Sequence, residues 1–210
     1  MLLNPLQFNA FLARMGQNFG WRKSYACPCL NPNSGAALPT CPLCGGKGRA
    51  WDDPVEGVAG ISGQQLQLRW AKMGLYEPGD VVLTLPSDSP IYDMGEFDRV
   101  AMLDSSAPFS DKFIRGRDDV LLRYPNVSIE RVFWLVDGEV VEGGIPDVGD
   151  DGVPAWLSGG EPPPGMVYSI TGRRRPEYFC WGPLPQDRAH HGGRDLPRKV
   201  VLRAFDLFGR

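Results

Sequence analysis

The chain has 210 residues, of which 42% are hydrophobic and 22% charged, a composition typical of a globular protein with a buried core. Its formal net charge of −3 excludes a protein that wraps nucleic acid with its whole surface, and its 26 glycines and 20 prolines exclude a mainly helical fold. No apolar stretch approaches the ~18–20 residues that cross a bilayer, and the N-terminus lacks the pattern of a signal peptide, so we expect a cytosolic chain with no membrane partner.

The first predicted element is a short amphipathic helix that begins at Pro5. Asn4 is a suitable N-cap, and proline is tolerated at the first helical position because its missing N–H would have no partner there. Gly16 is expected to end the helix in the left-handed conformation. The predicted apolar face carries four residues at helical spacing, namely Phe8, Phe11, Leu12 and Met15.

Two close pairs of cysteines follow the helix, Cys27-Pro-Cys29 and Cys41-Pro-Leu-Cys44. Zn²⁺ binds four thiolates in a tetrahedron, and paired cysteines in an intracellular chain indicate a metal site before disulfides. Glycines after the second pair can bring backbone N–H groups close to the sulfurs. We therefore predict a structural zinc knuckle; two disulfides or four inert thiols are the alternatives.

Beyond Trp51 the pattern is that of β-structure, so we expect residues 1–56 to hold the helix and knuckle and residues 57–210 to form a small β-barrel or sandwich. Asp137-Gly138 between two apolar runs is a strong hairpin signal, because both central residues of that turn need positive φ. The predicted strands are Leu66 to Trp70, Val81 to Leu85, Arg99 to Leu103, Val120 to Tyr124, Arg131 to Val136, Glu139 to Val141, Met166 to Ile170, Glu177 to Trp181 and Lys199 to Phe205.

Residues 142–165 form a long arm rich in glycine and proline, a length of loop that is uncommon inside a compact domain. Trp156 and Leu157 in its middle suggest a contact with another subunit; the alternative is that the arm folds back onto its own domain. Arg173, Arg174 and Arg175 are expected in a turn between two strands. They are further candidates for subunit contacts, unless they are simply a solvated run of charge.

The sequence offers no catalytic set. His190 and His191 are adjacent, so they point apart on a loop, and Cys180 lies in an apolar strand where a buried, unreactive thiol is expected. A zinc ion with four thiolates has no open position for water or substrate. We therefore expect that the protein is not an enzyme.

With the cysteine segment in view, the chain resembles the neck proteins of tailed bacteriophages, the head-completion or head–tail connector family. Three groups of segments carry the resemblance. The first is Trp21 to Cys29 with Cys41 to Gly48, and the second is Gly79 to Pro86 with Pro90 to Asp93 and Phe97 to Arg99. The third is Tyr168 to Thr171 with Pro176 to Tyr178, Leu196 to Arg198 and Leu202 to Gly209. The resemblance implies a β-barrel subunit of a homo-oligomeric ring in the virion neck, assembled in the host cytoplasm. The ring would join a portal or adaptor protein to tail proteins and continue the channel through which genomic DNA passes.

Two other classes also fit the cysteine spacing. A zinc-ribbon nucleic-acid binder needs basic and aromatic residues around the knuckle, and this segment has them in Arg22, Lys23, Lys47, Arg49 and Trp51. The zinc module of co-chaperones shares the Cys-x-x-Cys-x-Gly-x-Gly pattern, but it needs repeated units and this chain has one full copy.

Overall fold

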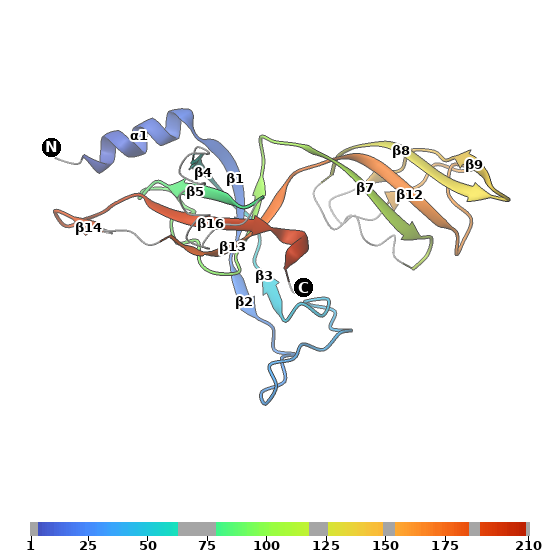
Figure 1. Cartoon of the computed structure of the whole chain (residues 1–210), viewed down its shortest axis with the longest axis horizontal. Helices are drawn as coiled ribbons and strands as arrows, with labels where there is room; N and C mark the ends of the chain where they lie inside the picture. Colours follow the sequence, from blue (N-terminus) through green and yellow to red (C-terminus); the bar gives the residue numbers. More distant parts are fainter. Residues whose placement is uncertain (1–3, 63–78, 118–125, 149–153, 185–189, 209–210) are drawn as a thin grey trace. The chain divides into compact units, whose positions relative to one another are not determined.

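The computed structural model describes residues 4–62, 79–117, 126–148, 154–184 and 190–208 (Figure 1). The chain forms two compact units, which we call the barrel unit (Met1–Asp104 with Glu177–Arg210) and the sheet unit (Ser105–Pro176). The boundary predicted between residues 56 and 57 does not separate two units, because it falls inside strand β4 (Val55–Ile61) of the barrel. The first 56 residues thus contribute strands to the barrel instead of forming a separate domain.

The barrel unit contains a closed barrel in the order β1-β4-β5-β16-β13-β6, with every neighbouring pair antiparallel. The prediction of a mainly β protein with a small barrel is therefore confirmed. Besides β4, the barrel strands are β1 (Gln17–Arg22), β5 (Val81–Leu85), β6 (Arg99–Met102), β13 (Glu177–Pro183) and β16 (Arg198–Ala204).

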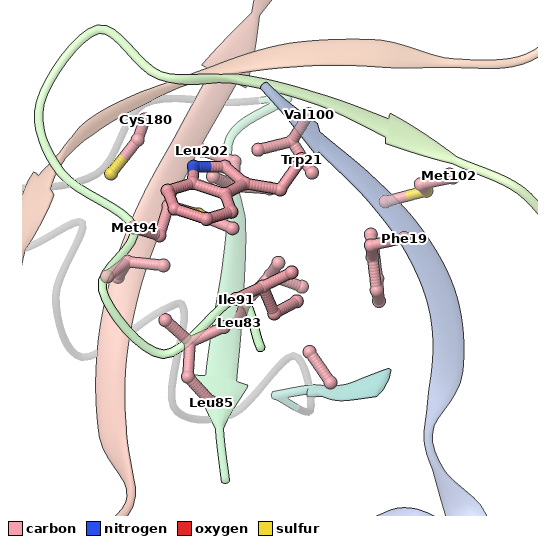
Figure 2. Close-up of a cluster of buried hydrophobic side chains, with 12 residues drawn as sticks. Phe19, Trp21, Leu83, Leu85, Ile91, Met94, Val100, Met102, Cys180 and Leu202 are labelled. Carbon is pink, nitrogen blue, oxygen red and sulfur yellow. The ribbon is translucent and has the colours of Figure 1, made fainter. Parts of the chain in front are cut away.

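The barrel core is filled largely by apolar side chains at alternate strand positions, since successive residues of a strand point to opposite faces (Figure 2). Ile91 and Met94, from the segment between β5 and β6, complete it. Cys180 is one of these core residues, and its burial raises the pKa of the thiol to about 12. It is thus the unreactive buried thiol that its apolar surroundings predict. The labelled core side chains are Phe19, Trp21, Leu83, Leu85, Ile91, Met94, Val100, Met102, Cys180 and Leu202.

Helix α1 (Pro5–Met15) begins as predicted, with the Asn4 side chain accepting a hydrogen bond from the Leu6 N–H at 3.2 Å. Its C-terminus differs from the prediction, because Gly16 is extended (φ −77°, ψ 177°) and leads directly into β1. None of the helices in the described ranges is long and apolar enough to cross a membrane.

The buried face of α1 also differs from the predicted apolar face. Leu12 is buried, but Phe8, Phe11 and Met15 are 41%, 58% and 66% exposed. Asn9 is buried instead: its amide donates to Ser87 Oγ at 2.9 Å and accepts from the Ser87 N–H at 3.2 Å. A polar residue can lie on the packed face when both of its hydrogen-bonding groups are satisfied, which helical periodicity alone does not reveal.

The sheet unit is built on an antiparallel sheet in the order β7-β12-β8-β9 (Figure 1). Its strands are β7 (Ala107–Ile114), β8 (Asn126–Val136), β9 (Glu139–Glu142) and β12 (Val167–Arg174). The hairpin between β8 and β9 turns at Asp137 (φ 50°) and Gly138 (φ 88°), as predicted. One face of the sheet packs on a core of Phe109, Phe113, Val132, Trp134, Tyr168 and Ile170.

The described part of the arm folds back onto the sheet unit. Short strands β10 (Asp147–Val148) and β11 (Pro154–Ala155) pair with each other, and Trp156 packs edge-on against Tyr168 with ring centroids 5.7 Å apart. Trp156 therefore contacts its own unit, as expected from the alternative in which the arm folds back onto its own domain.

Two of the predicted strands, Leu66 to Trp70 and Val120 to Tyr124, lie outside the described residues. The predicted turn at Arg173 to Arg175 is wrong in part, because Arg173 and Arg174 are the last residues of β12 and pair with Pro108 and Ala107 of β7. The remaining short elements are β2 (Ser24–Ala26), β3 (Arg49–Trp51), β14 (His190–His191), β15 (Arg194–Asp195) and the 3₁₀ turn η1 (Phe205–Leu207).

Gly172 lies at an irregularity in the pairing of β12 with β8, where the register shifts by one residue. A Cβ there would lie 2.2 Å from the carbonyl oxygen of Ser128, which is backbone and cannot move aside. We expect Gly172→Ala to lower the free energy of unfolding by about 1–3 kcal/mol, measured by urea denaturation. Ser110→Ala, at an exposed position of β7, is the control and should change it by less than about 0.5 kcal/mol.

Candidate metal centre

A two-stranded ribbon carries the knuckle, which we define as residues 27–48. In this ribbon β2 pairs with β3 through Ser24–Trp51, Tyr25–Ala50 and Ala26–Arg49. The ladder continues by one step into the knuckle, because the Cys27 N–H donates to the Gly48 carbonyl at 2.9 Å. The first and last residues of the knuckle are therefore held side by side.

Tight turns within the knuckle aim the sulfurs inward. The Gly45 N–H donates to the Cys41 carbonyl at 2.9 Å, and the Lys47 N–H donates to the Cys44 carbonyl at 3.1 Å. Gly48 has a φ of 73°, a conformation that L side chains rarely adopt, and its N–H lies 3.4 Å from the Cys44 sulfur as donor. The glycine thus supplies the hydrogen bond to sulfur that the sequence predicts.

All four predicted ligands come together: the sulfurs of Cys27, Cys29, Cys41 and Cys44 lie within 4.8 Å of one another. The Cys27–Cys41 and Cys29–Cys44 sulfur pairs are 3.7 and 3.5 Å apart. Sulfurs about 2.3 Å from a common tetrahedral centre are about 3.8 Å apart, so the observed spacing fits one metal ion. The cysteines are free thiols, and three of the four are buried, with Cys29 partly exposed.

Backbone N–H groups and crowding divide the protons unequally among the four thiols. The N–H groups of Cys44 and Leu43 lower the pKa of Cys41 to about 6. At Cys29 the Leu38 N–H favours the thiolate, but burial and the three neighbouring thiols outweigh it and raise the pKa to about 12. Four thiolates this close repel one another, so a bound cation is what would keep all of them ionised.

The pH dependence of metal retention follows from the Cys41 thiolate. Its pKa is lowered from 9.0 to about 6, so the stability it contributes is complete above pH 9.0 and is lost as the pH falls through about 6. Protons displace the metal in the same direction. We expect the ion to be retained at about pH 8 and to be released as the pH falls through about 6, measured with a colorimetric metal indicator. Release that increases as the pH rises would contradict this prediction.

An aromatic cluster joins the ribbon and the end of the knuckle to the rest of the barrel unit. Trp51 meets Phe205 and Phe208 edge-on, with centroids 5.4 and 5.6 Å away, and its indole N–H donates to the Phe97 carbonyl at 3.0 Å. The Arg49 guanidinium lies 4.0 Å from the centre of the Phe97 ring. These contacts anchor β3, which follows the last residue of the knuckle, to the rest of the barrel unit.

A buried carboxylate, Asp98, holds the other side of the ribbon. It accepts hydrogen bonds from the Trp21 indole N–H, the Ser24 N–H and the Gly95 N–H, each at 2.7 Å. Ser24 begins β2, so Asp98 links the first strand of the ribbon to a core residue of the barrel. Sequence reasoning did not single out Asp98; an Asp in a turn gives no sign of such distant donors.

The candidates for subunit contacts, Trp156, Leu157 and Arg173 to Arg175, belong to the sheet unit, whereas the four cysteines belong to the barrel unit. Leu157 is 75% exposed, while Arg173 donates to Ser106 and Arg174 forms a 3.0 Å ion pair with Asp111. Trp156 and Arg175 are partly buried. His190 also has a partner, since its Nδ1 lies 2.7 Å from an Asp195 carboxylate oxygen.

No model of a known protein family matches the chain, and no curated protein matches it either.

Proposed function

We propose that the protein is a structural subunit of the head–tail connector of a tailed bacteriophage, and that a zinc ion stabilises its knuckle. The observation that carries the proposal is the set of four converging thiols on a ribbon that packs against the barrel. Such a site stiffens a protruding segment that has little apolar surface of its own. The resemblance of the cysteine segment to phage neck proteins supports the connector role.

The donor set favours zinc and a structural task. Thiolates are soft ligands that suit zinc in a tetrahedral site, and four protein ligands complete its shell. A catalytic zinc site keeps one position for water or substrate, typically with three protein ligands. The residues here would therefore hold the ion and shape the knuckle, with no role for it in a reaction.

The charge of the chain suits a component of a DNA channel. A conduit must let DNA pass, and each basic contact with phosphate adds affinity that would slow the passage. The formal net charge is −3, and two cations near the knuckle lie over aromatic rings: Arg49 over Phe97 and Lys47 over Phe205, at 4.0 and 5.4 Å. This arrangement supports a structural knuckle over one that grips nucleic acid.

Three measurements on the purified full-length protein test the proposal. Elemental analysis should find one zinc per chain, native mass measurement should find ring-sized particles, and the protein should support tail attachment to genome-filled, tailless heads. A monomer that shifts DNA in a salt-dependent manner would instead favour a zinc-ribbon nucleic-acid binder. Metal-free protein with its thiols oxidised to one another would remove the basis of the proposal.

A further inference from the structure

The sheet of the sheet unit is open, and its two edge strands are β7 and β9. Among the described residues neither edge pairs with a further strand, as Figure 1 lets the reader follow along β7-β12-β8-β9. Edge strands present unpaired N–H and C=O groups and are natural sites for pairing with another chain. Proteins that stay monomeric protect such edges, so the open edges of β7 and β9 are candidate sites for pairing with another strand.

The face of the sheet opposite its core carries an apolar row near the β8–β9 turn. Val140 pairs with Leu135, and Val167 pairs with Ile114. The β8–β12 register at Trp134–Tyr168 places Leu135 and Val167 one step beyond that pair, so the four side chains form a row across the sheet. The first three of these side chains are 55%, 59% and 48% exposed. The row ends at both edges, so a strand added at either edge would extend it.

The two edge strands have complementary sequences when they are aligned antiparallel. The β9 edge reads Glu139-Val-Val-Glu142. The end of β7 reads Lys112-Phe-Ile114, and Arg115 follows it directly, with its N–H donating to the Met166 carbonyl. Continuing the rows of the sheet across its edge places Glu139 beside Arg115, Val140 beside Ile114, Val141 beside Phe113 and Glu142 beside Lys112. Each acidic residue thus meets a basic one, and each apolar residue meets an apolar one. Within its own copy Glu142 also pairs with Arg131, and the Arg115 guanidinium lies over the Trp156 ring, so Glu139 is the acidic residue of this edge whose partner comes from the next copy.

We infer that β9 of one copy of this chain pairs antiparallel with β7 of the next copy. The strand directions allow this pairing. All neighbouring strands of the four-stranded sheet are antiparallel, so the two outer strands, β7 and β9, run in opposite directions. Pairing in this way continues the sheet from one copy into the next. The contact is head-to-tail, which generates a closed ring or an open filament.

Pairing of like edges is disfavoured by charge. Two β9 strands would bring Glu139 and Glu142 of both copies together, and two β7 strands would bring together Lys112 and Arg115 of both. Like charges at directly opposed positions of a sheet are destabilising. The charges therefore select the head-to-tail contact over a two-fold symmetric one. The inference rests on the proposed function only for closure of the ring.

A cross-linking experiment tests the pairing directly. Val140→Cys and Ile114→Cys are made as separate variants of the full-length protein, with the native cysteines kept and zinc present. Opposed strand residues have Cα atoms about 4.5–5.5 Å apart, within the range that a disulfide spans. We expect a covalent dimer when the two variants are mixed under mild oxidation, and little or none from either variant alone or from the wild type.

Charge reversal tests the same contact without a covalent bond. Glu139→Lys with Glu142→Lys reverses the β9 edge, and Lys112→Glu with Arg115→Glu reverses the β7 edge. Each double variant alone should associate about tenfold more weakly than the wild type in sedimentation experiments. Mixing the two should restore association, because each altered edge then meets its complement. The control, Asp147→Lys with Glu161→Lys, makes the same charge change as the β9 variant at other exposed positions of the unit. It should have no effect on association.

The outcomes separate this inference from the proposed function. Rings that persist in both charge-reversed variants, absence of the mixed cross-link, or a cross-link from Val140→Cys alone would overturn the edge pairing and leave the connector role standing. Wild-type protein that stays monomeric at the highest attainable concentration would overturn it as well. Edge pairing that is found in particles unable to bind phage heads would support the contact and contradict the connector role.

Discussion

Replacing Cys44 with serine is expected to abolish stable metal binding. Cys44 is buried, its sulfur lies 3.5 Å from that of Cys29, and it receives the Gly48 N–H. The serine hydroxyl is a hard ligand with a far higher pKa than a thiol. The Cβ–O bond of serine is also shorter than the Cβ–S bond of cysteine, so the oxygen would not reach the fourth position of the tetrahedral metal site. We expect zinc affinity to fall by more than about a hundredfold, measured by competition with a chelator of known affinity.

The barrel should survive this change, because its core and the cysteine cluster are separate groups of buried residues. Circular dichroism of Cys44→Ser should therefore keep the strand signal of the wild type. Cys180→Ala is the matched control: it removes a thiol from the barrel core and should lower stability while leaving one zinc per chain. Complete loss of strand signal in Cys44→Ser would show that knuckle and barrel fold only together.

Replacing Asp98 with alanine is expected to cause the largest loss of stability among single changes near the ribbon. Asp98 is 3% exposed and accepts three hydrogen bonds at 2.7 Å. Its removal leaves the Trp21 indole N–H and two backbone N–H groups without their acceptor in a site that water reaches poorly. We expect the free energy of unfolding to fall by about 3 kcal/mol or more, measured by denaturant titration.

Asp104→Ala is the matched control for Asp98→Ala. The Asp104 carboxylate also accepts hydrogen bonds from a backbone N–H and a side chain, both of Asn18, at 2.8–3.2 Å, but it is exposed. Water can replace it as acceptor, so the loss should be about 1 kcal/mol or less. Equal losses in the two variants would show that burial of Asp98 is not what makes its hydrogen bonds important. Weaker zinc binding in Asp98→Ala, but not in Asp104→Ala, would further show that the hydrogen bond between Asp98 and Ser24 helps to hold the knuckle in place.

The metal ligands and most strands follow from local patterns in the sequence. Cys41 and Cys44 are separated by two residues, so a single turn brings their sulfurs together, and the four-residue set needs only one loop closure. The strand from Val81 to Leu85 and the Asp137-Gly138 turn are also local features, set by alternation and by φ. Such features depend little on the rest of the chain, which is why the sequence predicts them correctly.

The division into units and the face of the helix depend on contacts between distant residues. Strand β1 closes the barrel by pairing with both β4 and β6, and nothing near Gln17 in the sequence indicates β6, some eighty residues later. In the same way, Asn9 lies on the packed face of α1 because Ser87 satisfies it. Local patterns report an apolar residue's preference for burial, but not which distant partner makes a polar residue acceptable there.

The sheet unit is an insertion between two barrel strands that pair with each other. The chain leaves the barrel unit after Asp104 and returns at Glu177, which lies opposite Ala101 in the β6–β13 ladder. Because exit and re-entry are adjacent, a hairpin turn of a few residues could join them without altering any barrel pairing. The inserted module can therefore change in length or sequence without altering any barrel pairing, and the four cysteines, which all lie outside it, keep their place on the scaffold.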